Sequence, residues 1–98
     1  MSFYLYILRC SDGSYYVGHT DDLAERLGAH ESGEFRGYTY RRRPVQLVFA
    51  EEFYSREEAF QCERQIKGWS RQKKEALTRG DWDGLARLSR AHGSTGSP

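Results

Sequence analysis

The first twenty residues constrain the fold most, because they combine two strand-like segments with a short turn. Residues 3–9 (FYLYILR) and 15–19 (YYVGH) are rich in β-branched and aromatic residues. The SDGS sequence at 11–14 supplies the residues that tight turns favour. The sequence therefore predicts a β-hairpin at the start of the chain.

The length of this turn decides which side chains of the hairpin share a face. Side chains alternate along a strand with a period of two, and directly opposed residues lie on one face. A two-residue turn at Asp12-Gly13 would place Tyr6 and Tyr16 on opposite faces. An odd-numbered loop, such as residues 12–14, or a bulge would place the two tyrosines on the same face.

A helical period replaces the strand pattern after Thr20. Leu23, Arg26, Leu27 and His30 recur at i, i+3, i+4 and i+7, which predicts a helix capped by Thr20 or by one of the two aspartates that follow it. Strand and capping patterns predict the remaining elements. We expect a third strand at 45–53, a helix from near Arg56 behind a Ser55–Glu58 capping box, a third helix from Ser70 to near Gly80, and a short helical turn at 81–90.

These elements follow the order β-β-α-β-α-α, which predicts an α+β fold with a small three-stranded antiparallel sheet flanked by helices. Ninety-eight residues bury one modest core, so we expect a single domain over residues 1–90. The small and polar residues 91–98 are expected to form a disordered tail. Neither a membrane span nor a secretory signal is recognisable, so we expect a cytoplasmic protein without a membrane partner.

The charged residues are distributed unevenly, although the net charge is only +1. Residues 36–43 (RGYTYRRR) contain four arginines and no acid, and a second basic stretch runs through 64–79. Segregated charge of this kind can build a basic face on a nearly neutral protein. Cys10 and Cys62 are isolated from each other and from histidines, so we expect neither a structural zinc site nor a disulfide framework.

Glu63 is the most unusual residue, because it falls on the apolar stripe of the expected second helix between Cys62 and Ile66. An unpaired buried charge costs several kcal/mol, on the order of 3–5. The simplest interpretation is a structural ion pair with Arg26 or a boundary position that reaches water. Arg26 and His30 lie one turn apart on the first helix, and alone they are typical of a snorkelling arginine beside a solvated histidine.

Taken together, these residues form an ordered pattern. The chain contains, in sequence, Tyr-Leu-Tyr at 4–6, Tyr-Val-Gly at 16–18, Arg26, His30 and Glu63. This pattern resembles the GIY-YIG nuclease domain, in particular its small stand-alone bacterial members, which are similar to the N-terminal domain of the excision-repair incision subunit. The resemblance covers the chain up to about the third expected helix.

The resemblance implies a metal-dependent endonuclease that hydrolyses DNA phosphodiester bonds, with structure-specific cleavage in repair or recombination as its setting and RNA as the alternative substrate. Glu63 would hold Mg²⁺, which Mn²⁺ could replace. Tyr6 or His30 would be the general base, with Tyr16 assisting Tyr6. Arg26 would clamp the scissile phosphate through a planar two-point contact.

The resemblance and the basic segments together also predict the substrate contacts. Cations that contact phosphates read no sequence, so binding should be weak and should fall steeply with salt. The expected nucleic-acid-binding residues are Gly18, His19, Tyr38, Arg41, Arg42, Arg43, Lys67, Arg71, Lys73 and Lys74.

The sequence departs from the family pattern in two places. Its first motif reads Tyr-Leu-Tyr rather than Gly-Ile-Tyr, which keeps Tyr6. Many catalytic members carry an asparagine beyond the glutamate, whereas this chain contains no asparagine and offers only Gln72 as a substitute. The alternative function is therefore a nucleic-acid-binding module that cleaves poorly or not at all. A small adaptor of a repair or RNA-associated complex is a third hypothesis, and we expect a monomer or weak homodimer that a protein partner directs to its target.

Overall fold

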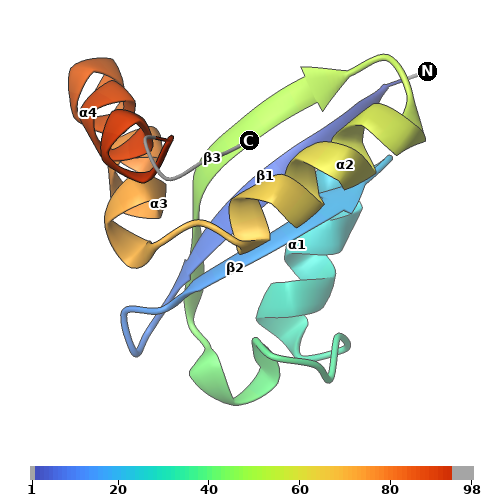
Figure 1. The fold of residues 1–98 in the computed structure, drawn as a ribbon. Coiled ribbons are helices and arrows are strands. Elements are labelled where there is room, and N and C mark those ends of the chain that lie inside the picture. The colour runs from blue at the N-terminus through green and yellow to red at the C-terminus, as the bar shows by residue number, and fades with distance from the viewer. Residues whose placement is uncertain (1, 94–98) are drawn as a thin grey trace. The chain divides into compact units, whose positions relative to one another are not determined.

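The computed structural model describes residues 2–93, which divide into two compact units after Lys67. The first unit contains a three-stranded antiparallel sheet and two α-helices (Figure 1). The predicted α+β class is confirmed. The elements are β1 (Phe3–Cys10), β2 (Tyr15–Thr20), α1 (Leu23–Ser32), the 3₁₀-helix η1 (Tyr40–Arg42), β3 (Val45–Phe53), α2 (Arg56–Lys67), α3 (Arg71–Arg79) and α4 (Trp82–Gly93).

Cys10 and Ser14 close the hairpin between β1 and β2, so its loop consists of the three residues 11–13. The amide of Cys10 donates to the carbonyl oxygen of Ser14 at 2.8 Å, and the amide of Gly13 donates to the carbonyl oxygen of Cys10 at 2.9 Å. Gly13 has a φ of 85°, in the left-handed region that glycine enters without strain. The loop therefore has an odd number of residues, which was one of the two predicted alternatives. It spans residues 11–13 and so begins one residue earlier than the example of 12–14.

This loop length sets the register of the hairpin. Tyr6 pairs with Gly18 and Leu8 pairs with Tyr16 in the antiparallel ladder. Because directly opposed residues share a face, Tyr6 and Tyr16 lie on the same face of the sheet. The two-residue turn, which would have separated them, is excluded.

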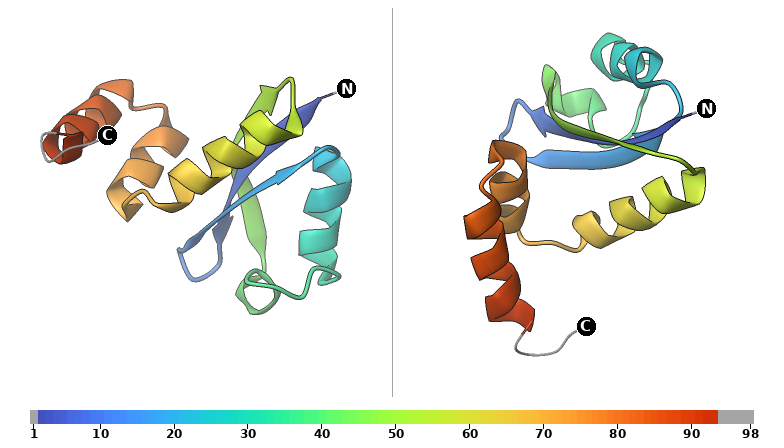
Figure 2. Two further views of the ribbon diagram at one scale, coloured as in Figure 1. Left: turned by 45° about the vertical axis from the view of Figure 1, so that its right-hand side comes forward. Right: turned by 90° about the horizontal axis from the view of Figure 1, so that it is seen from above.

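The two helices of the first unit cover opposite faces of the sheet, whose strand order is β2-β1-β3 (Figure 2). On one face, Tyr6, Leu8, Cys10 and Val45 form a buried cluster against which the leucines of α1 pack. On the other face lies α2, which buries Ala59, Glu63 and Ile66. His19 is opposed to Leu5, which alternates with Tyr6 along β1, so His19 belongs to the α2 face.

Side-chain caps set the starts of α1 and α2. The carboxylate of Asp22 accepts from the amide of Glu25 at 3.0 Å, so Asp22, one of the two predicted aspartates, is the N-cap rather than Thr20. At the start of α2, the hydroxyl of Ser55 accepts from the amide of Glu58 at 3.1 Å. This bond is the forward half of the predicted capping box.

The second unit consists of α3 and α4. Ser70 caps α3 as predicted, by accepting from the amide of Lys73 at 3.2 Å, and Gly80 ends it with a φ of 71°. α4 has 12 residues, so it is longer than the predicted short turn. Asp81 promotes its start by accepting from the amide of Gly84 at 2.9 Å.

Two predictions concern the limits of the chain's folded part. Residues 91–93 of the expected tail belong to α4, and residues 94–98 lie outside the described residues. The single domain over residues 1–90 stays a prediction. No helix within residues 2–93 has both the length and the apolar character needed to cross a membrane.

Candidate active site

A buried chain of three polar side chains lies between β1 and α1. The hydroxyl oxygen of Tyr6 is 2.9 Å from Nε2 of His30, and Nδ1 of His30 is 2.7 Å from the hydroxyl oxygen of Thr39. All three side chains have an exposed fraction of 0%. His30 is therefore buried and is not a solvated histidine, which its pairing with Arg26 alone would have suggested. Since a neutral imidazole has one donor and one acceptor nitrogen, the chain can run in either direction.

Tyr16 is half-buried and belongs to an aromatic cluster around these three hydrogen-bonded side chains. Its ring centroid lies 6.2 Å from that of Tyr6, 5.1 Å from that of His30 and 6.1 Å from that of Tyr38. Phe35 packs on His30 with the ring centroids 4.5 Å apart. The cluster brings together four predicted residues, namely Tyr6, Tyr16 and His30 of the catalytic set and Tyr38 of the nucleic-acid-binding set. The contacts of Phe35 and Thr39 with His30 were not predicted from the sequence, because both residues lie in loops without a periodic pattern.

Gly18 allows the two phenols to pack closely against β2. A Cβ atom at this position would lie 2.7 Å from the hydroxyl oxygen of Tyr6 and 3.1 Å from Cε2 of Tyr16. Both separations are shorter than ordinary van der Waals contact. The glycine is therefore required by the tyrosine rings. Its contact with nucleic acid stays a prediction.

Arg26 places a cation beside the phenols. Its guanidinium carbon lies 5.5 Å from the ring centroid of Phe35, and its hydrogen bond and charge act to lower the pKa of Tyr6. The same charge acts to lower the pKa of Tyr16 and of His30. The predicted Arg26 is thus within electrostatic range of all three groups.

Burial sets the protonation of these groups. The pKa of Tyr6 is raised far above its ordinary value, first by burial and then by the neighbouring Tyr16. Burial is also the largest cause of the raised pKa of Tyr16 and of the lowered pKa of His30. Near pH 7 both phenols are therefore protonated and the imidazole is neutral.

Glu63 lies on α2 and is 7% exposed. Its Oε1 contacts Nδ1 of His19, and its Oε2 lies 2.6 Å from Nζ of Lys67. The partners of the carboxylate are therefore His19 and Lys67, so the expected ion pair with Arg26 is wrong. The reason is position, because Arg26 lies on α1, which covers the other face of the sheet.

The charge of Glu63 nevertheless reaches the phenols on the other face. It acts to raise the pKa of both Tyr6 and Tyr16. β2 is an edge strand of the sheet. The candidate active site therefore surrounds β2, with Tyr6, Tyr16, Arg26 and His30 on the α1 side and His19 and Glu63 on the α2 side.

The donor set suits a weakly held, hydrated ion. Within residues 2–93, no group of three or more histidine, cysteine, aspartate or glutamate side chains is arranged to hold a metal. Glu63 contributes one carboxylate, and the adjacent His19 contributes one imidazole. Mg²⁺ commonly keeps most of its waters and takes one or two carboxylates together with substrate phosphates. These residues therefore fit a divalent ion that the substrate helps to hold.

The predicted nucleic-acid-binding arginines differ in their surroundings. The guanidinium carbon of Arg42 lies 3.8 Å from the ring centroid of Tyr38, and its Nη1 donates to the carbonyl oxygen of the same residue at 2.9 Å. Nε of Arg43 donates to the carbonyl oxygen of Tyr40 at 2.9 Å. Arg41 is exposed. Arg42 and Arg43 thus support their own loop, whatever they contact in a substrate.

Three of the other predicted contacts belong to the second unit. Arg71 pairs with Glu75 at 3.2 Å between Nε and Oε2, and Nζ of Lys73 lies 4.4 Å from the ring centroid of Trp69. Lys74 is half-buried. Their part in substrate binding stays a prediction.

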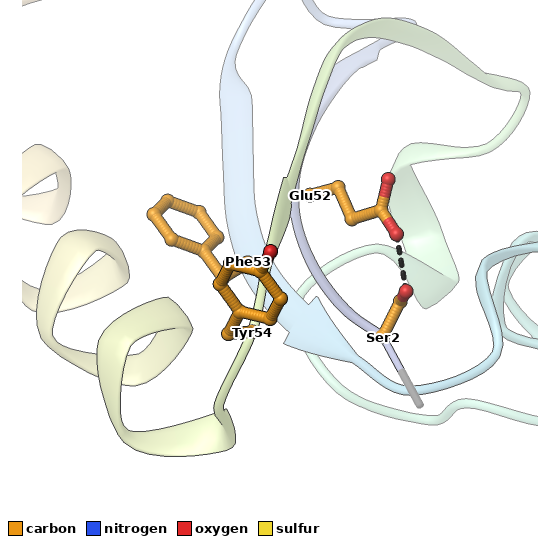
Figure 3. Close-up of a pocket in the computed structure, with 4 residues that line it drawn as sticks. All are labelled: Ser2, Glu52, Phe53 and Tyr54. Atoms are coloured by element: carbon orange, nitrogen blue, oxygen red, sulfur yellow. Dashed lines mark hydrogen bonds between the residues drawn. The ribbon is translucent and has the colours of Figure 1, made fainter.

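A pocket of about 390 Å³ lies away from these residues, at the ends of β1 and β3 (Figure 3). It is lined by Ser2, Glu52, Phe53 and Tyr54, and the hydroxyl of Ser2 donates to the carboxylate of Glu52. None of the four is a predicted site residue.

Comparison with known proteins relates the chain to a described domain family. Residues 2–76 match the family described as the GIY-YIG catalytic domain. A UPF0213 protein from Bacillus pumilus is 49% identical over 72 residues, which are 74% of each chain. A UPF0213 protein from Halobacterium salinarum is 45% identical over 74 residues, 76% of this chain and 96% of the relative.

Solved structures agree with this relation. The solution NMR structure of the UPF0213 protein BH0048 from Bacillus halodurans is 42% identical, with a TM-score of 0.54 over 91% of this chain and 98% of the other. The protein EF2693 from E. faecalis is 39% identical, with a TM-score of 0.58 over 82% and 85%. On its matching residues, its relatives and its fold, this chain belongs to the GIY-YIG domain family.

Proposed function

We propose that this protein is a metal-dependent endonuclease that hydrolyses phosphodiester bonds in DNA. The observation that carries the proposal is the arrangement around β2. Two phenols, an imidazole and a guanidinium lie on one side of the strand, and the charge of Glu63 reaches both phenols from the other side. Membership of the GIY-YIG family supports the same class of reaction.

Glu63 is the proposed metal-binding residue. A bound Mg²⁺ or Mn²⁺ would supply positive charge to the nonbridging oxygens of the phosphate as negative charge builds there. The ammonium of Lys67 lies 2.6 Å from Oε2 of Glu63. The carboxylate would bind the metal only after this ammonium has moved away. Lys67 would then be free to contact the substrate backbone.

The solvent exposure of the three candidate side chains indicates which of them can contact the attacking water. Tyr6 and His30 have no exposed surface, whereas Tyr16 is half-buried and can meet a water molecule directly. The ring of Tyr16 lies beside that of Tyr6, with the centroids 6.2 Å apart, and the hydroxyl oxygen of Tyr6 lies 2.9 Å from Nε2 of His30. We assign water contact to Tyr16, and we assign the receiving end of the proton path to His30, through Tyr6. In the tautomer that donates from Nδ1 to Thr39, the neutral imidazole accepts at Nε2 from Tyr6 and can take the proton there.

Arg26 is the proposed phosphate clamp. It lies beside the phenols, and its planar guanidinium can hold two oxygens of a phosphate at once. Removing one such stabiliser of a charged transition state typically costs ~10²–10³ in rate. We also propose that the protein acts in DNA repair or recombination.

A cleavage assay tests the proposal. Labelled plasmid, single-stranded DNA, branched DNA and RNA are incubated with purified protein in Mg²⁺ or Mn²⁺, beside a Glu63→Ala variant. We expect DNA cleavage that requires the metal and disappears in the variant. Cleavage that is unchanged in Glu63→Ala would remove Glu63 from the mechanism, and cleavage of RNA alone would correct the substrate.

The second candidate function is a nucleic-acid-binding module that does not cleave. Two observations favour it, namely the lack of any asparagine in the chain and the pairing of both oxygens of Glu63 by His19 and Lys67. This candidate predicts salt-sensitive DNA binding without cleavage in either protein of the same assay.

A further inference from the structure

We propose that His19 is a second protein ligand of the metal at Glu63, so that a nitrogen and an oxygen hold the ion together and favour Mn²⁺ over Mg²⁺. The inference rests on the proposed function, since it concerns the metal of that reaction. It goes further by adding a ligand and a choice of metal.

The position of His19 follows from the hairpin register. Its opposite residue on β1 is Leu5, so its side chain belongs to the face that α2 covers. There, Nδ1 of His19 contacts Oε1 of Glu63, 44 residues further along the chain. The ring of Phe60, one turn before Glu63 on α2, packs against the imidazole with the centroids 5.5 Å apart and the planes inclined by 56°. The histidine is therefore oriented by packing as well as by the carboxylate.

The two donor atoms are close enough to share an ion after a small adjustment. Ligands at ~2.0–2.2 Å from one metal, at right angles to each other, lie ~3 Å apart. To share an ion, the contact between His19 and Glu63 would have to open to this separation, while Lys67 contacts the other oxygen of the carboxylate. His19 is partly exposed, with 21% of its side chain accessible, so an ion and its waters can reach the pair.

The chemistry of the pair favours a transition ion. Mg²⁺ prefers oxygen ligands in a strict octahedron, whereas an imidazole nitrogen binds first-row transition ions more strongly. Among these, Mn²⁺ also accepts carboxylate, water and phosphate oxygens. With only two protein donors, the remaining positions would belong to water and to the scissile phosphate. The pair therefore suits Mn²⁺ better than Mg²⁺.

A different reading keeps the imidazole off the metal. In that case His19 only orients Glu63 by a hydrogen bond, and the ion is bound by oxygen atoms alone. The two readings differ in one measurable property, which is the coupling of the ¹⁴N nucleus of His19 to the unpaired electrons of Mn²⁺.

The test is a titration of the purified protein with Mn²⁺ alone, followed by electron paramagnetic resonance and by electron spin echo envelope modulation. Wild type is compared with His19→Gln, Glu63→Gln and, as a control on the same helix, Glu57→Gln, which removes an exposed carboxylate. We expect ¹⁴N modulation in wild type and in the control and none in His19→Gln. Even an outer-shell partner is worth ~10–100-fold in metal affinity, so His19→Gln should weaken Mn²⁺ binding at least ~10-fold.

Competition with Mg²⁺ provides the second readout. We expect wild type to bind Mn²⁺ at least ~10-fold more tightly than Mg²⁺, and His19→Gln to lose most of this preference. Amide NMR spectra establish that each variant is folded, and His19→Asn replaces His19→Gln if the latter is not.

The possible failures can be told apart. Mn²⁺ binding that needs Glu63 but lacks ¹⁴N modulation overturns the role of His19 and leaves the endonuclease intact. An absence of Mn²⁺ binding to wild type also overturns the inference, and the separate cleavage assay then decides whether the proposed function fails with it.

Discussion

At the scale of single residues, burial separates groups of the same chemical type. Tyr6 and Tyr16 carry the same phenol, yet Tyr6 is fully buried and hydrogen-bonded to His30, whereas Tyr16 is half-buried. The sequence left the general base open between Tyr6 and His30. Since neither has any exposed surface, we propose that Tyr16 makes the direct contact with water.

Replacement of Arg26 tests the phosphate clamp. We expect Arg26→Ala to lower cleavage by ~10²–10³ and Arg26→Lys to restore little of it, because an ammonium cannot make the two-point contact. Initial rates on labelled DNA measure the loss, and circular dichroism checks the fold. The control is Arg9→Ala, since Arg9 is an exposed residue of β1. Normal rates in Arg26→Ala would rule out the clamp.

The pH dependence of stability tests the buried state of His30. Its folded pKa is lowered by burial and by Arg26, below the unfolded value of ~6.5. The unfolded chain then binds more protons just below pH 6.5, so the free energy of unfolding should fall as the pH drops from about 6.5 through the lower folded pKa. Urea titrations at about pH 7.5, 6.5 and 5.5 should give a smaller decrease in His30→Gln. Equal decreases in both proteins would contradict a buried, neutral His30.

At the scale of elements, the hairpin positions most of the site. β1 supplies Tyr6, β2 supplies Tyr16, Gly18 and His19, and their common register determines which of them face α1. The packing of the two phenols against Gly18 leaves no room for a further side-chain atom.

A pair of glycine replacements tests this packing. Gly18→Ala should destabilise the protein by ~1–3 kcal/mol, because its Cβ would lie 2.7 Å from the hydroxyl oxygen of Tyr6 in a filled site. Gly28→Ala is the matched control on α1, since apart from its chain neighbours and the nearby backbone of the helix itself no atom lies within 4 Å of its Cβ position. That change should be neutral or stabilising by up to ~1 kcal/mol. Denaturant unfolding measures both, and equal effects would show that the close approach is unimportant.

Local signals predicted the elements, because strand composition, turn residues and capping residues act over a few positions. Ser55 and Ser70 cap their helices as expected, and Glu63 is buried as its place on the stripe of α2 indicated. Its partners could not be predicted in the same way. His19 meets Glu63 across 44 residues, and Thr39 meets His30 from a loop, so both contacts depend on the tertiary fold.

At the scale of the whole molecule, the cations are divided between two compact units. Arg41, Arg42, Arg43 and Lys67 belong to the first unit, whereas Arg71, Lys73 and Lys74 belong to the second. The net charge of +1 gives little general attraction for DNA, so the proposed DNA binding would depend on local groups of cations. The oligomeric state and a protein partner for targeting stay predictions.

Salt dependence tests the contribution of an exposed cation. DNA affinity should fall steeply with salt, and Arg41→Ala should reduce the slope of log affinity against log salt by ~1 for every DNA sequence tried. Fluorescence anisotropy at several salt concentrations gives the slope. Arg79→Ala is the control, because Arg79 already pairs with Asp81 at 3.6 Å. An unaltered slope in Arg41→Ala would exclude a phosphate contact there.

The three-residue loop at 11–13 has an effect well beyond the turn itself. If one residue were deleted from it, the strands could still join through a tight two-residue connection, but every partner on β2 would shift by one position. Tyr16 would then project away from Tyr6, and His19 away from Glu63. A hairpin of normal appearance would have lost the arrangement on which the proposed chemistry depends, so the length of a surface turn matters as much to the candidate site as its side chains do.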